Sequence, residues 1–359
     1  MPLDADLQAW LRLSLLPGLG QQSLRKLLVS LGTPEKILAA SSRELTSTVS
    51  EKTASAIRNG GAADDEVGKV ETWLKDPANH VVTLADREYP RTLLETPDPP
   101  PLLYVKGRLD LLNSPGFAIV GSRNATAQGC GNAEAFAQAL STAGLTIISG
   151  LALGVDAAAH RGGLKGLSST VAVVGTGLDI VYPSRNRELA HLVAEQGALI
   201  SEFALGTPAL ATNFPRRNRL ICGMAKGCLV VEAAISSGSL ITARIAADQG
   251  REVFAIPGSI HSPLAKGCHA LIKQGAKLVE SAQDILEELG YKNNPVISPT
   301  VELSPDGDII QRIGFDPVNF DTLLQRCGLD AAELNTVLTR LELDGQIESL
   351  PGGRWQRTG

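Results

Sequence analysis

The chain has 359 residues, of which 43% are hydrophobic and 20% are charged, and its formal net charge is -5 at pH 7. These values predict two or three domains with a large core, and they exclude a protein coated in positive charge, although a local basic groove is compatible with them. Because no run is long and apolar enough to predict a membrane span, and the N-terminus lacks the pattern of a signal peptide, we expect a cytoplasmic protein with no membrane partner.

The cysteines and histidines show no pattern of a metal centre. Five cysteines are scattered along the chain without a C-x-x-C pair, and the five histidines have no metal-ligand spacing. Buried free thiols in a reducing compartment are the favoured interpretation, and we expect no metal and no cofactor.

Residues 1–78 predict a helical unit. The segment LPGLGQQSLRKLLVSLG places a glycine-containing turn, residues 16–20, before an amphipathic helix with Leu24, Leu27, Leu28 and Leu31 on its apolar side. Such a turn between short helices resembles a helix-hairpin-helix or SAM-like element, whose backbone N–H groups can hold a DNA phosphate. A small helical packing module is the simpler and favoured alternative.

Residues 79–290 alternate short apolar runs with helical stretches. A proline-rich segment lies at the start, and residues 102–105 predict an additional strand that feeds into this region. Further strands are expected at residues 117–121, 145–149, 170–175, 198–202, 228–232, 252–256 and 277–280. The alternation predicts an α/β fold, namely an extended Rossmann-like, doubly wound, mostly parallel sheet.

The ends of these strands carry glycine, serine and arginine, and ligands of such sheets bind outside the carboxyl ends of the strands. The segment 117–121 runs into Gly121-Ser122-Arg123 instead of the G-x-G-x-x-G of a dinucleotide site. Later strand ends bring Gly150, a serine-rich turn at residues 236–239, and arginines at positions 216, 217 and 219. Backbone N–H groups, hydroxyls and guanidinium groups on one rim predict a site for a polyanion.

Each of these features also has a structural interpretation. A glycine after a strand usually marks a turn, and Asp156 with His160, four positions apart on a helix, is more often a surface pair than an orienting pair. Ser237 lacks the G-x-S-x-G elbow and a partnered histidine, so a serine hydrolase is not expected. The functional interpretation therefore depends on the whole set of turns together with the arginines.

Residues 291–310 predict a linker, and residues 311–359 predict a winged-helix domain. Two apolar stripes at helical spacing precede a two-stranded wing that turns at residues 351–353, and Asp330 with Glu333 predicts a capping box for the second helix. Because that helix is acidic, it repels phosphate. A protein-contact or regulatory role is favoured, with wing contacts to DNA through Arg354 and Arg357 as the alternative.

The motifs between residues 80 and 290 resemble, in order and spacing, those of the DNA-processing protein A family (DprA, also called Smf). The matching segments are AIVGSR, SGLALGVDAAAH, VVGTGLDIVYPSRN, SEFALGTPALATNFPRRNRLICGMAKGCLVVEAAISSGSLITARIAADQGREVFAIPG and KGCHALIKQGA. The resemblance implies a bacterial homodimer that binds and protects single-stranded DNA and loads the recombinase RecA onto it in natural transformation. It also implies that the protein is not an enzyme.

The resemblance assigns roles to matching positions. Arg123 is expected to contact phosphates, Phe214 to stack on a base, and Arg217 and Arg219 to line the same pocket. Many members carry a lysine three residues before the phenylalanine; this chain has Ala211 there, and Arg216 is a candidate replacement. The full set assigned to single-stranded DNA is Gly121, Ser122, Arg123, Asn124, Gly150, Phe214, Arg216, Arg217, Asn218, Arg219, Ser237, Gly238 and Ser239. The dimer interface is assigned to His269, Leu271 and Leu278.

A nucleotide-processing enzyme of the phosphoribohydrolase type is the alternative from another class. Its Gly/Ser/Thr loops on a Rossmann-like sheet are similar, and Glu232 stands just before the serine-rich turn. Such an enzyme needs a small closed pocket with a carboxylate poised for catalysis, whereas an open arginine groove suits a polymer.

Overall fold

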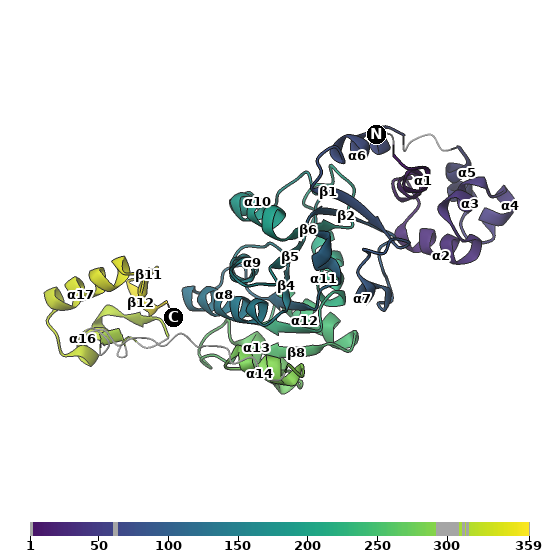
Figure 1. The fold of residues 1–359 in the computed structure, drawn as a ribbon. Coiled ribbons are helices and arrows are strands. Elements are labelled where there is room, and N and C mark those ends of the chain that lie inside the picture. Colours follow the sequence, from purple (N-terminus) through teal and green to yellow (C-terminus); the bar gives the residue numbers. More distant parts are fainter. Residues whose placement is uncertain (1–2, 60–63, 292–308, 311–312, 314–315, 359) are drawn as a thin grey trace.

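A nine-stranded sheet forms the centre of the molecule (Figure 1). The computed structural model describes residues 3–59, 64–291, 309–310, 313 and 316–358. The strand order across the sheet is β1-β2-β6-β5-β4-β3-β7-β8-β9. The strands are β1 (Asn79–Thr83), β2 (Leu102–Gly107), β3 (Gly116–Val120), β4 (Thr146–Ser149), β5 (Thr170–Val173), β6 (Ala198–Ser201), β7 (Gly227–Val230), β8 (Glu252–Ala255) and β9 (Lys277–Leu278).

The strands from β3 to β9 run parallel, whereas β1 and β2 pair antiparallel at one side of the sheet. In the central strand, Ala118 pairs with Ile148 of β4 on one side and with Cys228 of β7 on the other. Every residue of β3 to β7 is buried, which explains why these strands are continuous apolar runs in the sequence. The predicted doubly wound, mostly parallel sheet is confirmed.

Helices cover both faces of this sheet. On one face α8, α9 and α14 pack around Phe117 and Ile119, and on the other α11, α12 and α13 pack around Ala118 and Val120. Successive residues of a strand point to opposite faces, so β3 anchors both layers. The helical elements of this region are α7 (Arg91–Leu94), η1 (Leu109–Asn113), α8 (Ala127–Thr142), α9 (Val155–Lys165), η2 (Ser184–Asn186), α10 (Arg187–Gln196), α11 (Asn213–Gly223), α12 (Gly238–Asp248), α13 (Lys266–Lys273) and α14 (Ala282–Glu288).

Helices that precede the sheet form the N-terminal helical unit, which packs directly on it. They are α1 (Ala5–Ser14), α2 (Gln21–Leu31), α3 (Pro34–Ala39), α4 (Ser42–Thr46), α5 (Glu51–Asn59) and α6 (Asp64–Trp73). Leu24 and Leu27 of α2 lie in a core of this unit, whereas Trp10 and Leu11 of α1 join Tyr104 of β2 in a core shared with the sheet. The unit is therefore joined to the sheet by buried apolar contacts as well as by the chain.

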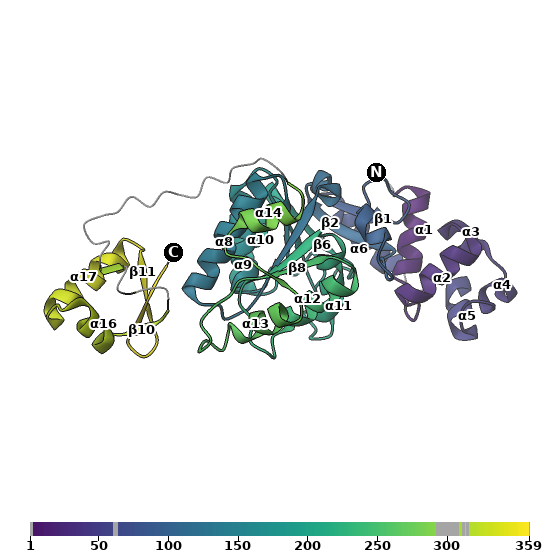
Figure 2. The ribbon, with the colours of Figure 1, turned by 90° about the horizontal axis from the view of Figure 1, so that it is seen from below.

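A second, smaller unit follows at the C-terminal end and has its own apolar core. It contains β10 (Val318–Asn319), α16 (Phe320–Cys327), α17 (Ala331–Leu343), β11 (Ile347–Leu350) and β12 (Arg354–Arg357). The predicted capping box is present, because the Asp330 side chain accepts from the Glu333 N–H at 2.8 Å. The wing turns through Gly352 and Gly353, both with positive φ, which glycine adopts without strain. Figures 1 and 2 place this unit and the N-terminal helices at opposite ends of the sheet domain.

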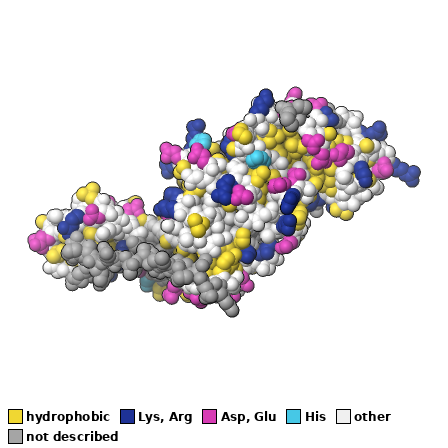
Figure 3. Space-filling model, viewed as in Figure 1, with side chains coloured by type: hydrophobic (Ala, Val, Ile, Leu, Met, Phe, Trp, Pro, Cys, Tyr) yellow, Lys and Arg dark blue, Asp and Glu magenta, His cyan; other side chains and the backbone are white. Residues whose placement is uncertain are grey.

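The surface is mixed in charge. Figure 3 shows basic and acidic side chains interspersed over the face seen in Figure 1, so that face carries no single extended positive field. In the part of the chain that the structure describes, no helix has the length and apolar character needed to cross a membrane, and no His/Cys/Asp/Glu cluster could hold a metal ion.

Candidate nucleic-acid interface

The main groove of the molecule lies where the order of the strands reverses. The chain winds outward from β3 to β6 on one side and from β7 to β9 on the other, so the loops that follow β3 and β7 separate in opposite directions. A cavity of about 720 Å³ opens at this point and is lined by loop residues 120–124, the first turns of α11 and the loop before α12. We call it the strand-end groove.

The loop after β3 presents Arg123 to this groove. The Ser122 N–H donates to the backbone carbonyl of Glu232 at 2.7 Å, and the Ser122 hydroxyl accepts from the Asn124 N–H at 3.1 Å. These two bonds fix the turn, so that the exposed Arg123 side chain extends from a rigid base. The arginine takes the place that the second glycine would have in a dinucleotide loop.

The start of α8, where a nucleotide phosphate would sit, is filled by the protein itself. The carboxylate of Glu232 accepts from the Thr126 N–H at 2.9 Å and from the Thr126 hydroxyl at 2.6 Å. A side chain at Gly129 would collide with that carboxylate, since a Cβ there would lie 2.4 Å from its carbon. A negative charge at a helix N-terminus is favourable, so the Glu232 carboxylate occupies the position at which an anion could bind to α8.

An aromatic cluster faces Arg123. The Phe214 ring at the start of α11 lies 5.5 Å from the Arg123 guanidinium carbon and 5.6 Å from the ring of Tyr182. Tyr182 is 47% exposed and lines the groove. Sequence reasoning did not assign Tyr182 to the site, although an aromatic residue in a turn after a strand was a usable signal. Flat rings beside a guanidinium group suit a base and its phosphate.

Arg217 lies beneath the groove and is buried. Its guanidinium donates to the backbone carbonyls of Gly150 and Val173, its Nε donates to Asn218 at 3.0 Å, and Asp156 lies 3.9 Å away. Burial lowers the pKa of Arg217 to about 10, so the group stays charged at neutral pH. Arg217 lines the groove, and its guanidinium binds the backbone carbonyls at the ends of β4 and β5.

Gly150 lies directly against the Arg217 guanidinium. A Cβ on Gly150 would lie 2.2 Å from Arg217, so this position requires glycine to admit the guanidinium. Gly150 is buried and does not line the strand-end groove, in contrast to the expectation. Asp156 is buried beside Arg217, and burial raises the pKa of its carboxyl while the positive guanidinium opposes that rise.

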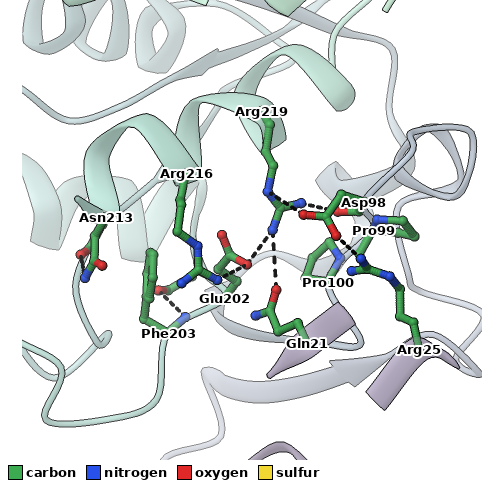
Figure 4. A network of polar contacts seen from close by, with 12 residues as sticks. Gln21, Arg25, Asp98, Pro99, Pro100, Glu202, Phe203, Asn213, Arg216 and Arg219 are labelled. Atoms are coloured by element: carbon green, nitrogen blue, oxygen red, sulfur yellow. Dashed lines mark hydrogen bonds and ion pairs between the residues drawn. The ribbon is translucent and has the colours of Figure 1, made fainter. Parts of the chain in front are cut away.

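Arg216 and Arg219 do not reach the strand-end groove, contrary to the prediction. A helix turns 100° per residue, so positions 217 and 219 point to nearly opposite sides of α11. Arg219 contacts Asp98 and Glu202, while Arg216 stacks on Phe203 at 5.2 Å and lies 3.4 Å from Glu202 (Figure 4). Arg216, the candidate replacement for the family lysine, does not line the groove, whereas Ala211 does.

The remaining residues predicted for DNA binding all line the strand-end groove. The Ser237 hydroxyl caps α12 by accepting from the Ser239 N–H at 3.3 Å, and the two hydroxyls lie 2.7 Å apart. The predicted residues that line the groove are Gly121, Ser122, Arg123, Asn124, Phe214, Arg217, Asn218, Ser237, Gly238 and Ser239. The pattern of strand ends thus located the groove, and the predicted residues that do not line it are Gly150, Arg216 and Arg219.

His160 is a buried structural residue. The Thr170 hydroxyl donates to the Ile147 carbonyl at 2.7 Å, so the His160 Nδ1–H donates to that hydroxyl and Nε2 accepts from the Leu151 N–H at 3.2 Å. Leu151 has a φ of 58°, and this bond holds its left-handed turn. Burial lowers the pKa of His160 to about 3. His160 and Asp156 have separate partners and are not the expected surface pair.

The residues predicted for a dimer interface are not equivalent. Leu271 is 6% exposed and belongs to the core of its own chain, so its assignment to an interface is wrong. Leu278 is 50% exposed on β9, the edge strand of the sheet. His269 lies near the same edge on α13, and its Nε2 is 3.1 Å from the Gly258 carbonyl oxygen. Leu278 and His269 are the members of the set that a partner could reach.

Comparison with known proteins gives a consistent result. Residues 80–290 match the family model described as DNA recombination-mediator protein A, and residues 298–353 match the DprA winged helix domain. The chain is 44% identical to protein Smf of Escherichia coli over 292 residues, which cover 78% of each protein. It is similar to the solved structure of DNA processing protein A from Streptococcus pneumoniae, with a TM-score of 0.69, 37% identity, and coverage of 80% of this chain and 99% of that one.

A second solved structure is described by its single-stranded DNA binding mode. It is DNA processing protein A from Helicobacter pylori, with a TM-score of 0.55, 28% identity, and coverage of 60% of this chain and 98% of that one.

Proposed function

The chain belongs to the DNA recombination-mediator protein A family (DprA/Smf), and we propose that it binds single-stranded DNA in the strand-end groove and passes it to a RecA-type recombinase. On this proposal it protects incoming single strands in the cytoplasm during natural transformation and acts as a homodimer. The similarity to the Helicobacter pylori protein, which is described as binding single-stranded DNA, supports the first step.

The observation that carries the proposal is the position of Arg123 beside Phe214. An exposed guanidinium and an accessible ring meet at one opening, with their centres 5.5 Å apart. A nucleotide of a single strand offers a phosphate and an unstacked base at a similar spacing, whereas a duplex hides the base faces in its stack. The serine hydroxyls and backbone N–H groups of residues 236–239 provide further donors along the groove.

Glu232 argues for binding over hydrolysis. A phosphoribohydrolase needs a carboxylate directed at its substrate, but both oxygens of Glu232 accept hydrogen bonds from Thr126. The groove is also open and extended, with a volume of about 720 Å³, which suits a polymer more than an enclosed monophosphate. Incubation with nucleoside monophosphates should release no free base; release at a catalytic rate would favour the enzyme.

The test of DNA binding is fluorescence anisotropy with unlabelled competitors, using single- and double-stranded oligonucleotides over a salt series. We expect tighter binding of the single strands and a linear fall of log K with log salt. Arg123→Ala should weaken binding to unrelated sequences alike and flatten the slope by about one ion. Arg108→Ala, which breaks an exposed pair with Asp110 outside the groove, is the matched control. A folded Arg123→Ala protein with unchanged affinity would remove this loop from the site.

A further inference from the structure

A chain of alternating charges connects the N-terminal helical unit to α11 (Figure 4). Arg25 of α2 pairs with the Asp98 carboxylate and donates to the Pro99 carbonyl at 2.9 Å. Arg219 of α11 donates to the Asp98 backbone carbonyl, and its Nε lies 3.5 Å from the Asp98 carboxylate. Arg219 also pairs with Glu202, which follows β6. We call these residues, with Arg216, the charge network.

The network is buried around Glu202, whereas the Asp98 and Arg216 side chains are 50% and 51% exposed. The Glu202 side chain is fully buried, and those of Arg219 and Arg25 are 16% and 18% exposed. Arg216 and Arg219 share Oε2 of Glu202, while its Oε1 is buried without a partner. A buried carboxylate in this setting depends on its cations, since the loss of one partner leaves an uncompensated charge. The position of α11 therefore depends on the ion pairs that its arginines make with Glu202.

The opposite side of α11 enters the strand-end groove. Phe214 and Asn218 line the groove from this helix, and Arg217 ties it to the ends of β4 and β5. A helix of eleven residues moves as one body, so a shift on the side of the charge network moves the Phe214 ring relative to Arg123. The aromatic cluster thus depends on contacts made by the N-terminal helical unit.

We propose that Asp98, Glu202 and Arg219 are positioning residues, through which the N-terminal helical unit sets the affinity of the groove for single-stranded DNA without contacting the strand. The proposal rests on the proposed function of the groove. It gives the arginines of α11 two separate tasks. Arg217 holds the helix to the sheet, and Arg219 connects it to α2 through Asp98 and through a contact of 3.5 Å with Gln21.

The test uses the double variant Glu202→Gln/Arg219→Gln in the full chain, which removes a pair of opposite charges together. We expect the dissociation constant for a single-stranded oligonucleotide to rise about 3- to 10-fold, which lies within the range found for side chains that act through packed neighbours. The salt slope should stay that of the parent protein, since no phosphate contact is removed. Asp76→Asn/Lys106→Gln removes an ion pair between β2 and the loop before β1, outside the charge network, and is the matched control.

A measurement without DNA separates this proposal from the proposed function. With Phe214→Trp as a reporter, acrylamide should quench the added fluorescence more strongly in the double variant than in the parent. If the parent binds no single-stranded DNA, the proposed function fails while the quenching result still stands. Unchanged quenching with unchanged affinity overturns the positioning role, and so does a weaker affinity with a flattened salt slope. If the double variant does not fold, the partly exposed Asp98→Asn carries the same test.

Discussion

Phe214 is the side chain of the strand-end groove that we propose to stack on a base. Its ring contacts Tyr182 and lies beside Arg123, and it is partly buried at the start of α11. Phe214→Ala should cost roughly 1–3 kcal/mol of single-strand affinity, the usual value of one base stacked on an aromatic ring. Anisotropy titration measures the loss. Phe214→Tyr keeps the ring and should retain the affinity.

The opposite result would assign Phe214 to the core of the protein. Gly175 approaches the ring, so that a Cβ there would lie 3.1 Å from it. If Phe214→Ala lowers the melting temperature while each folded molecule binds as before, the ring belongs to the core and the base contact lies elsewhere.

His160 gives the fold a defined sensitivity to acid. In the unfolded chain its pKa is near 6.5, and in the folded protein burial lowers it to about 3. The unfolded state therefore takes up the proton first, and the stabilising contribution present above pH 6.5 is lost as the pH falls towards 3. The loss amounts to several kcal/mol, at about 1.4 kcal/mol for each pKa unit.

His160→Gln isolates this effect. The variant should be less stable at pH 7, because the bonds to Thr170 and Leu151 fit a ring, but its free energy of unfolding should fall less steeply between pH 6.5 and pH 4. Urea unfolding at a series of pH values measures both quantities. Parallel pH curves for the variant and the parent would show that folding does not lower the pKa of His160.

Some contacts of the site residues could be predicted from the sequence and others could not. The motif around Arg123 and Phe214 predicted two residues that do meet in the groove. The three arginines of α11 were interpreted as one cluster because they are adjacent in the sequence, whereas the helical period separates them. The 100° rotation was available from the sequence, but the identity of the buried acceptors, such as the Gly150 carbonyl, depends on tertiary contacts.

At the scale of elements, the strongly apolar strands were predictable, whereas the edge strand β1 and the short β10 were not. β3 to β7 are buried on both faces and appear as apolar runs. β1, with the sequence NHVVT, lies at the edge of the sheet and begins with two polar residues, so its pattern is weak. The short β10 owes its existence to pairing with β12, which no local pattern encodes.

The acidic α17 determines what we expect of the C-terminal unit. It carries Glu333 and Glu342 on exposed positions, which repel a phosphate backbone. Removal of residues 292–359 should leave the dissociation constant for a single strand essentially unchanged, because the groove lies within the sheet domain. The same anisotropy titration, with a thermal unfolding control, measures it. A collapse of binding in the folded truncated protein would make the winged helix the DNA module.

At the scale of the whole molecule, the sheet ends at β9 in an edge that carries the exposed Leu278. One short groove holds a strand weakly, and two linked grooves raise the effective concentration without new contacts. Leu278→Arg with His269→Ala should therefore give a folded monomer that binds long single strands more weakly. Light scattering measures the mass. Leu167→Arg, on a leucine that is 83% exposed elsewhere, is the matched control and should not change it.

A dimer that persists in the Leu278→Arg/His269→Ala protein would place the interface elsewhere, and an unfolded protein would assign both side chains to the core. The sequence could not distinguish Leu271 from Leu278, since both are leucines near the end of one α/β unit. Leu271 is 6% exposed because it lies on the face of α13 that packs in the core, whereas Leu278 is 50% exposed on the edge strand β9.

The carboxylate of Glu232 at the start of α8 has a consequence for competition inside a living cell. Free nucleotides and metabolites with phosphate groups are abundant there, and many Rossmann-like sheets bind them at this helix N-terminus. In this protein the Glu232 carboxylate already occupies that position. Because it belongs to the chain, it does not dissociate. We therefore expect ATP and other small phosphates to compete poorly with a strand, so that the groove stays available to DNA whatever the energy state of the cell.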